Sequence, residues 1–157
     1  MKYSKEVGRI LQEGTPDEVA AWLEHEEIDV NASLVPSTPA LSLTPLRVAL
    51  MGRNAPVVKL LAERGAVVDA VPGEEHAPLA SALVAQDATT ARVLLEAGVN
   101  PNLVVEGVLP LVLALVKKDE ALVRLLVEFG ADPDLVYDQF GTTPRRMATA
   151  QNWDIFA

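Results

Sequence analysis

The chain contains no cysteine and only two histidines among its 157 residues. Without thiols it can form no disulfide framework, no thiolate zinc site and no cysteine nucleophile. The histidines, His25 and His76, stand 51 positions apart, and neither is next to a serine in a recognisable catalytic motif. Although His25 lies within an acidic run, neighbouring helix positions point in different directions and do not converge on a metal. We therefore expect no catalytic residue, no metal site and no cofactor.

Aromatic residues and basic residues are also scarce. Phe, Trp and Tyr make up 4% of the chain, whereas 50% is hydrophobic, so a core would consist mainly of Ala, Leu and Val. The chain has 13 Lys and Arg against 22 Asp and Glu, a net charge of -9. Nucleic acid and anionic membranes require clustered basic residues, so we expect neither as a partner. The acidic field would attract a basic protein partner, or it serves solubility alone.

Long apolar runs and glycine-rich phosphate loops are missing as well. The apolar segment 109–115 is far too short to span a bilayer, and residues 1–6 lack the apolar centre of a targeting signal. No glycine-rich loop follows a strand pattern, so nucleotide binding has no support. Together with the lack of cysteine, these absences predict a cytoplasmic protein.

A repeated interval between proline and glycine dominates what is present. Three prolines are each followed twenty residues later by a glycine: Pro45 by Gly65, Pro78 by Gly98, and Pro110 by Gly130. With Pro144 as a fourth start, the prolines step by 33, 32 and 34 residues. A period in this range indicates stacked helical units.

Each unit is predicted to contain two antiparallel helices and a connector. Proline suits the first turn of a helix, and Thr44 before Pro45 can cap the free amides there. The first helix is broken around residues 52–54, and a second amphipathic run over 57–61 ends at Gly65, which can adopt the left-handed conformation that closes a helix. An Asp or Asn stands four residues after each glycine, which favours a hairpin-like turn to the next unit.

At these residues the chain resembles the ankyrin repeat. The family pattern is Thr-Pro-Leu-His at the first helix, Val-Val-x-x-Leu-Leu in the second, and then Gly-Ala-x-x-Asn or Asp; residues 138–144 also match its Asp-x-x-Gly-x-Thr-Pro hairpin. The sequence departs from the pattern in two places: the Gly-His between helices is missing, and the histidine after Thr-Pro-Leu is replaced by Arg47, Ala80, Val112 or Arg145. The resemblance implies an all-α solenoid of stacked helix-turn-helix units, small and, from the style of the sequence, bacterial.

The same pattern divides the single domain, 1–157, into units. Residues 1–32 form a degenerate, acidic N-terminal cap with helices over about 4–13 and 16–26, because a terminal repeat exposes one face to water. Residues 33–43 form a long loop, 44–70, 77–102 and 109–134 are full repeats, and 143–157 is an incomplete unit. Either the last unit folds back onto the preceding one, with Trp153 and Phe156 covering its open face, or the chain is a fragment. Association of copies through this apolar end is a further hypothesis.

The resemblance implies that a partner binds the concave side, formed by hairpin tips and the exposed face of each first helix. On this mapping the candidate partner-binding residues are Leu43, Met51, Glu74, Glu75, His76, Val84, Val105, Glu106, Val108, Val116, Lys117, Tyr137, Gln139 and Phe140. Met51, Val84 and Val116 share one register and would form an apolar column with acidic edges. Exposed apolar rows are uncommon on monomers unless they bind a partner. The alternative is that the register is off by one and the column belongs to the core; Glu74, Glu75 and His76 are either a contact surface or a solvated loop tip.

These observations predict a non-catalytic protein that acts by binding another protein, one that is basic or presents an exposed apolar segment. An inhibitor or immunity-type protein against a toxin or effector is one form of this function. A general scaffold or adaptor, a regulatory subunit of an enzyme, or the ankyrin part of a larger protein are the alternatives.

Overall fold

The computed structural model describes residues 4–25, 28–35, 42–69, 77–104, 107–138 and 141–156. Within these segments the chain forms nine α-helices and no strand, which confirms the predicted all-α class. The helices are α1 (Lys5–Glu13), α2 (Pro16–His25), α3 (Pro45–Met51), α4 (Ala55–Glu63), α5 (Pro78–Val84), α6 (Ala88–Glu96), α7 (Pro110–Val116), α8 (Glu120–Glu128) and α9 (Pro144–Ala150).

The first helix of each unit begins at its proline, as predicted. Proline lacks an amide hydrogen and has the φ of a helix, so it costs nothing in the first turn. The hydroxyl of Thr44 accepts from the amide of Arg47 at 3.3 Å, and that of Thr143 accepts from Arg146 at 3.2 Å. These side chains therefore cap α3 and α9 in the same way.

The second helices begin at a polar capping residue that was not predicted from the sequence. Asn54, Asp87 and Asp119 stand at equivalent positions before α4, α6 and α8, and each side chain accepts from the amide three residues later. Such capping satisfies an amide that would otherwise have no partner within the helix. The two helices of a unit therefore each have a defined start.

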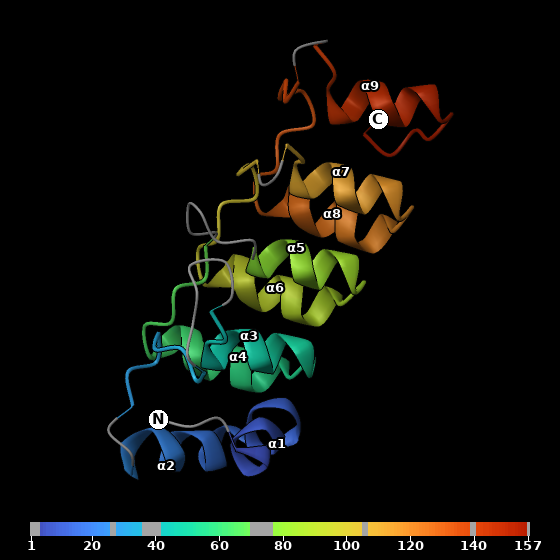
Figure 1. The fold of residues 1–157 in the computed structure, drawn as a ribbon. Coiled ribbons are helices and arrows are strands. Elements are labelled where there is room, and N and C mark those ends of the chain that lie inside the picture. Colours follow the sequence, from blue (N-terminus) through green and yellow to red (C-terminus); the bar gives the residue numbers. More distant parts are fainter. Residues whose placement is uncertain are drawn as a thin grey trace.

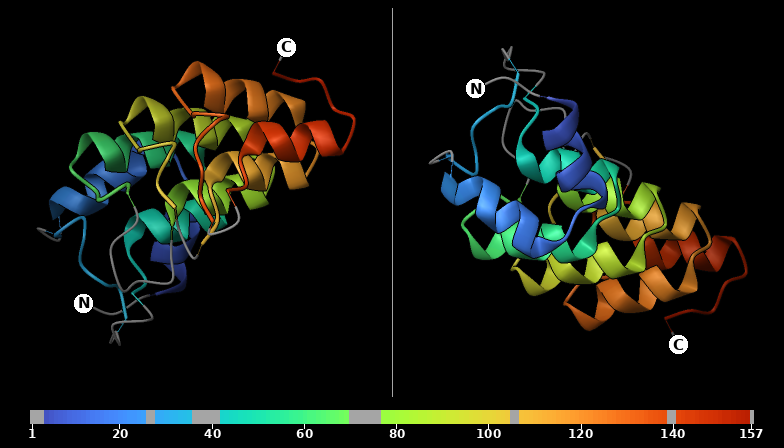
Figure 2. Two further views of the ribbon diagram at one scale, coloured as in Figure 1. Left: turned by 90° about the horizontal axis from the view of Figure 1, so that it is seen from above. Right: turned by 90° about the horizontal axis from the view of Figure 1, so that it is seen from below.

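The helices form two parallel rows. One row contains α1, α3, α5, α7 and α9, and the other contains α2, α4, α6 and α8, with contacts between successive members of each row and between the two helices of a pair. Figure 1 shows the pairs following one another along an elongated molecule, and the views along the other direction in Figure 2 separate the two rows. The row of first helices and the row of second helices thus present different faces to solvent.

A continuous apolar core runs between the rows, from α1 to α9. Alanines at one register of the first helices, Ala49, Ala82, Ala114 and Ala148, are all buried. Small side chains at this register let successive first helices approach closely, and leucines of the second helices fill the remaining space. These alanines therefore belong to the core, whereas the residues just before two of them, Ser81 and Leu113, are only half-buried.

Left-handed backbone recurs at three positions of the unit. One of them is three residues before the helix-starting proline, where Gly107 and Gly141 have φ of 77° and 70°. Gly65, Gly98 and Gly130 have φ of 87°, 94° and 90°, which confirms their predicted role in closing the second helix. The same conformation occurs after the first helices, at Arg53, Gln86 and Lys118 in the turns between paired helices and at Asn152 after α9, with φ of 53° to 55°. These are the turns in which the sequence lacks the glycine of the ankyrin pattern, and a residue with a side chain adopts the conformation instead.

The ends of the chain also agree with the predicted helices where they are described. In the cap, α1 begins after Ser4, whose hydroxyl accepts from Val7 at 3.1 Å, and α2 ends at His25. Of the long loop 33–43, residues 36–41 lie outside the described segments. Leu34 is buried, and its amide donates to the carbonyl of Leu43 at 2.9 Å.

None of the described helices is long and apolar enough to cross a membrane.

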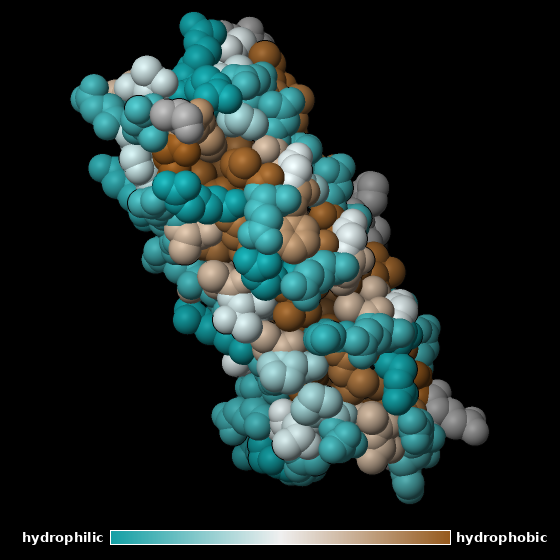
Figure 3. All heavy atoms as spheres, turned by 180° about the vertical axis from the view of Figure 1, so that it is seen from behind, coloured by the Kyte–Doolittle hydropathy of each residue, from teal (hydrophilic) through white to brown (hydrophobic). Residues whose placement is uncertain are grey.

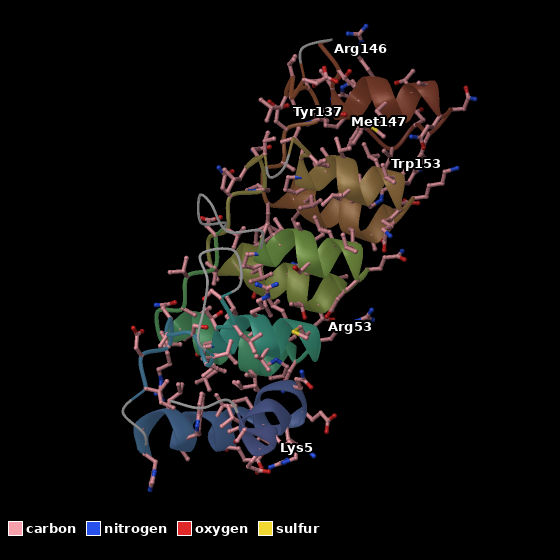
Figure 4. The ribbon with its side chains drawn as sticks, in the orientation of Figure 1. Lys5, Arg53, Tyr137, Arg146, Met147 and Trp153 are labelled. Carbon is pink, nitrogen blue, oxygen red and sulfur yellow. The ribbon has the colours of Figure 1, made fainter. Side chains whose placement is uncertain are left out.

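After α9 the chain folds back toward α7 and α8. Trp153, Ile155 and Phe156 are half-buried and pack against the core, and Trp153 lies on the side of α9 that faces the preceding pair (Figure 4). Arg145 holds this tail: its Nη1 donates to the carbonyl of Phe156 at 2.8 Å, and its guanidinium lies 5.6 Å from the centre of the Phe156 ring. The tail therefore covers part of the last pair.

Candidate binding surface

Three equivalent apolar side chains are exposed at the ends of consecutive first helices. Met51, Val84 and Val116 are 67%, 54% and 60% exposed. The preceding residue in each helix is a buried leucine, so the register is unambiguous. The alternative that this column belongs to the core is therefore wrong. We call Met51, Val84 and Val116 the apolar column.

The edge of the apolar column at the interhelical turns carries basic residues, whereas the acidic residues predicted beside the column, Glu74, Glu75 and Glu106, lie outside the described segments. Exposed Arg53 follows Met51, and exposed Lys117 and Lys118 follow Val116. In Figure 4, Arg53 extends from the turn at the end of α3, while Tyr137 lies on the opposite, hairpin side of the molecule. On the hairpin side, the acidic residue Asp69 lines a pocket together with Val84.

The other predicted site residues fall into two groups. Leu43, Val108 and Tyr137 are half-buried, and Leu43 packs against the core, so these side chains offer less surface than the apolar column. The remaining predicted residues lie outside the described segments: Glu74, Glu75, His76, Val105, Glu106, Gln139 and Phe140. The structure therefore brings together the apolar column, Lys117 and, as described next, Val108.

An apolar pocket of about 200 Å³ lies between α5, α7 and the connecting segments on the hairpin side. It is lined by Val68, Asp69, Ala77, Pro78, Leu79, Ala80, Val84, Val99, Asn100, Leu103, Val108, Pro110 and Leu113. Two of the predicted site residues, Val84 and Val108, contribute to its wall. Among the described residues that line it, Asp69 is the only charged one.

A shallower groove accompanies the neighbouring member of the column. It lies between α3 and α5 and is lined by Arg47, Leu50, Met51, Arg53, Ser81 and Ala85. Arg47 occupies in this groove the position that Ala80 occupies in the pocket, since each is the second residue after the helix-starting proline. The groove and the pocket share three repeat positions: Arg47 corresponds to Ala80, Met51 to Val84, and Ser81 to Leu113. The groove extends toward the interhelical turns and the pocket toward the connectors.

The connectors are tied to one another by asparagine side chains. Asn31 donates from Nδ2 to the carbonyl of Gly65 at 3.0 Å, and its Oδ1 accepts from the amide of Val67 at 2.8 Å. Asn102 makes the same two bonds in a later unit, to Gly130 at 2.9 Å and from Asp132 at 2.8 Å. Their sequence context predicts turn residues only. Nothing in their spacing indicated that the side chain reaches the next unit, because that contact depends on stacking.

The row of second helices has a different character. Arg92 of α6 donates two hydrogen bonds of 3.2 Å to Glu128 of α8, and Arg64 donates one of 3.2 Å to Glu24. The hydrogen bond from Arg92 lowers the pKa of the Glu128 carboxyl below its usual value. Figure 3 views this face: polar side chains cover much of it, and apolar surface shows between them, including a patch beside the C-terminal end. Charged pairs between successive helices are typical of a solvated face.

Comparison with known proteins yields no assignment: the chain matches no protein-family model, and no curated protein is significantly similar to it. Within the described segments, moreover, no three His, Asp or Glu side chains gather in a way that could hold a metal ion. The apolar column and the pocket beside it are consequently the surface features from which a function can be inferred.

Proposed function

We propose that this chain is an ankyrin-type solenoid of the cytoplasm that acts by binding a protein partner through the face formed by its first helices and hairpin-side segments. The observation that carries the proposal is the apolar column, three equivalent side chains between 54% and 67% exposed on consecutive helices. Support for the repeat architecture comes from the proline period and from the left-handed residues at equivalent positions of four units.

The chemistry of this surface favours a protein over a small polar ligand. A small polar ligand is held by convergent polar groups inside a concave site, whereas the apolar column extends along three units of the stack. Protein interfaces combine apolar anchors at the centre with charged groups at the rim. The column with Arg53, Lys117 and Lys118 along one edge has this composition. The protein acts stoichiometrically in this proposal, and catalysis plays no part.

The test is a double variant of the apolar column, Met51→Glu with Val116→Glu. Because both side chains are exposed, the variant retains its helix content and melting temperature, measured by circular dichroism. In an affinity purification from the source organism, followed by mass spectrometry, the partner captured by the parent protein is lost from the variant. The identity of that partner also separates an inhibitor of a toxin or effector from an adaptor or an enzyme subunit.

A matched control uses exposed residues on the row of second helices. Val127 of α8 and Thr89 of α6 are exposed, and Val127→Glu with Thr89→Glu adds the same charge. The control variant retains the partner if the column is the binding surface. Equal loss in both double variants, or retention in both, would show that the apolar column does not bind the partner.

A further inference from the structure

One position in the wall of the pocket between α5 and α7 carries a very different residue in the groove between α3 and α5 one unit earlier. Arg47 lines the earlier groove and donates from Nη1 to the carbonyl of Ser42 at 3.1 Å. Arg146, and not Arg145 as predicted from the sequence, stands two residues after the proline of the last unit, and it donates to the carbonyl of Gly141 at 2.8 Å. Each arginine thus reaches back along the segment that precedes its helix. Ala80 stands at this position in α5, and the volume that an arginine would fill remains part of the pocket.

The charged residue of the pocket also departs from its equivalents. Asn31 and Asn102 each make two hydrogen bonds to the next connector, one as donor and one as acceptor. Asp69 is the equivalent of Asn102 in the preceding unit, since each stands four residues after the helix-closing glycine. The Oδ1 of Asp69 accepts from the amide of Asn100 at 3.2 Å. An ionised carboxylate has no hydrogen to donate, so the bond to the glycine carbonyl is not available to it. The unit that contains the pocket therefore gives up a stabilising bond and gains a negative charge.

The size and the charge of the pocket define what it fits. At about 200 Å³ it is smaller than the cavities of roughly 300–1,000 Å³ that hold small-molecule ligands, so it suits one side chain. Its wall is apolar, which favours a large apolar side chain. A carboxylate with remaining acceptor capacity at such a wall pairs with a Lys or Arg.

Resting on the proposed function, we propose that this pocket receives a large apolar side chain from a segment of the protein partner, and that Asp69 pairs with a Lys or Arg close to that side chain in the segment. The apolar column then contacts the remainder of the partner, with Val84 belonging to both the column and the pocket wall. Ala80 provides the space and Asp69 provides the preference for a cation. The partner is therefore recognised by an apolar residue next to a basic one.

The experiment is selection of random twelve-residue peptides, displayed on phage, by the purified full chain. Two variants give the pocket the residues that other units carry: Ala80→Arg, as in Arg47 and Arg146, and Asp69→Asn, as in Asn31 and Asn102. Each introduces a residue that the fold already accommodates at that position, and melting measured by circular dichroism verifies folding. Arg124→Ala, on the row of second helices, is the control for surface changes elsewhere.

The parent protein and the control select peptides in which Leu, Met, Phe or Trp lies within two positions of Lys or Arg. Ala80→Arg reduces recovery of these peptides at least roughly tenfold, the loss expected when a buried anchor is excluded. Asp69→Asn retains the apolar preference and loses the basic one. The proposal is overturned if the folded parent protein selects no such motif, if Ala80→Arg leaves recovery unchanged, or if Asp69→Asn keeps the basic preference. None of these outcomes decides whether the proposed function is correct. That function is tested separately, by whether the double variant Met51→Glu with Val116→Glu loses the natural partner.

Discussion

The side-chain amide of Asn102 donates a hydrogen bond of 2.9 Å to the carbonyl oxygen of Gly130, 28 residues later in the chain. The bond joins the connector of one helix pair to the glycine that closes the second helix of the next. Asn31 and Gly65 repeat the relationship at the start of the stack. Successive units are therefore linked by side-chain to backbone bonds as well as by apolar packing, and the unit around Asp69 lacks the donor for this bond.

Replacing Asp69 by Asn is predicted to stabilise the protein. The new amide can donate to the carbonyl of Gly98, as Asn102 donates to Gly130, and a net contribution of about 1 kcal/mol is expected for one such bond. The reverse change, Asn102→Asp, removes the donor and lowers stability by a similar amount. Urea unfolding followed by circular dichroism measures both. If the two changes shift stability in the same direction, the inter-unit bond does not explain them.

Gly98→Val is predicted to destabilise the protein by more than about 1 kcal/mol, because a β-branched residue resists the left-handed backbone that Gly98 adopts. Its φ is 94°, and a Cβ there would have no atom within 4 Å, so crowding is not the cause. Gly98→Asn is the matched variant, since asparagine tolerates left-handed backbone better, and it should cost less. Thermal unfolding of the three proteins gives the order; equal stability of the Val variant and the parent would remove the helix-closing role of Gly98.

Gln86→Gly is predicted to stabilise the protein by about 0.5 kcal/mol. Gln86 has a φ of 53°, a conformation that is unfavourable for residues with a Cβ and open to glycine. Part of the gain is offset because glycine has more freedom in the unfolded chain. Ala85→Gly, one residue earlier at a helical φ of -74°, is the control and should destabilise. Chemical unfolding that shows both glycines to be destabilising would contradict the assigned backbone strain.

The pair between Arg92 and Glu128 is predicted to make stability depend on pH in the acid range. The pKa of Glu128 is lowered in the folded state, from a value of 4.5 for the isolated group, because Arg92 donates to its carboxylate. Its contribution is therefore present above about pH 4.5 and is lost as the pH falls through the lower, folded-state pKa. The melting temperature of Glu128→Gln should lie below that of the parent at pH 7, and the two should converge toward pH 3. A difference that is constant with pH would show that the loss has another cause.

Features that depend on a few neighbouring residues could be predicted from the sequence. Proline before an apolar run begins a helix because its φ and its missing amide suit the first turn, and Gly65 ends one because it tolerates left-handed backbone. The nine helices of the described segments follow from such local preferences, and so does the register that places Met51 on the outside. The left-handed Arg53 could not be predicted in this way, since its intrinsic preference opposes the conformation and closure of the turn between packed helices overrides it.

The candidate site was predicted less completely than the fold. Met51, Val84 and Val116 are exposed as expected, but the basic edge beside them and the half-buried position of Leu43 were not predicted. From the sequence, Ala80 could be recognised only as a residue that differs from the ankyrin pattern, and no role in a pocket could be predicted for it. Its effect on the pocket is visible only when α5 and α7 lie next to each other, because a pocket is formed by residues from several units.

The sequence by itself determined the helix pairs, their period and the acidic character of the chain, since these depend on residue types and on interactions within a few positions. Tertiary structure decided which side chains meet across units: Asn31 with Gly65, Arg92 with Glu128, and Asp69 with the wall formed by Val84 and Val108. These residues lie 15 to 39 positions apart, and only the packing of successive helices brings them within reach. The candidate binding surface depends on that packing, because each unit contributes a part of it and no single unit contains it.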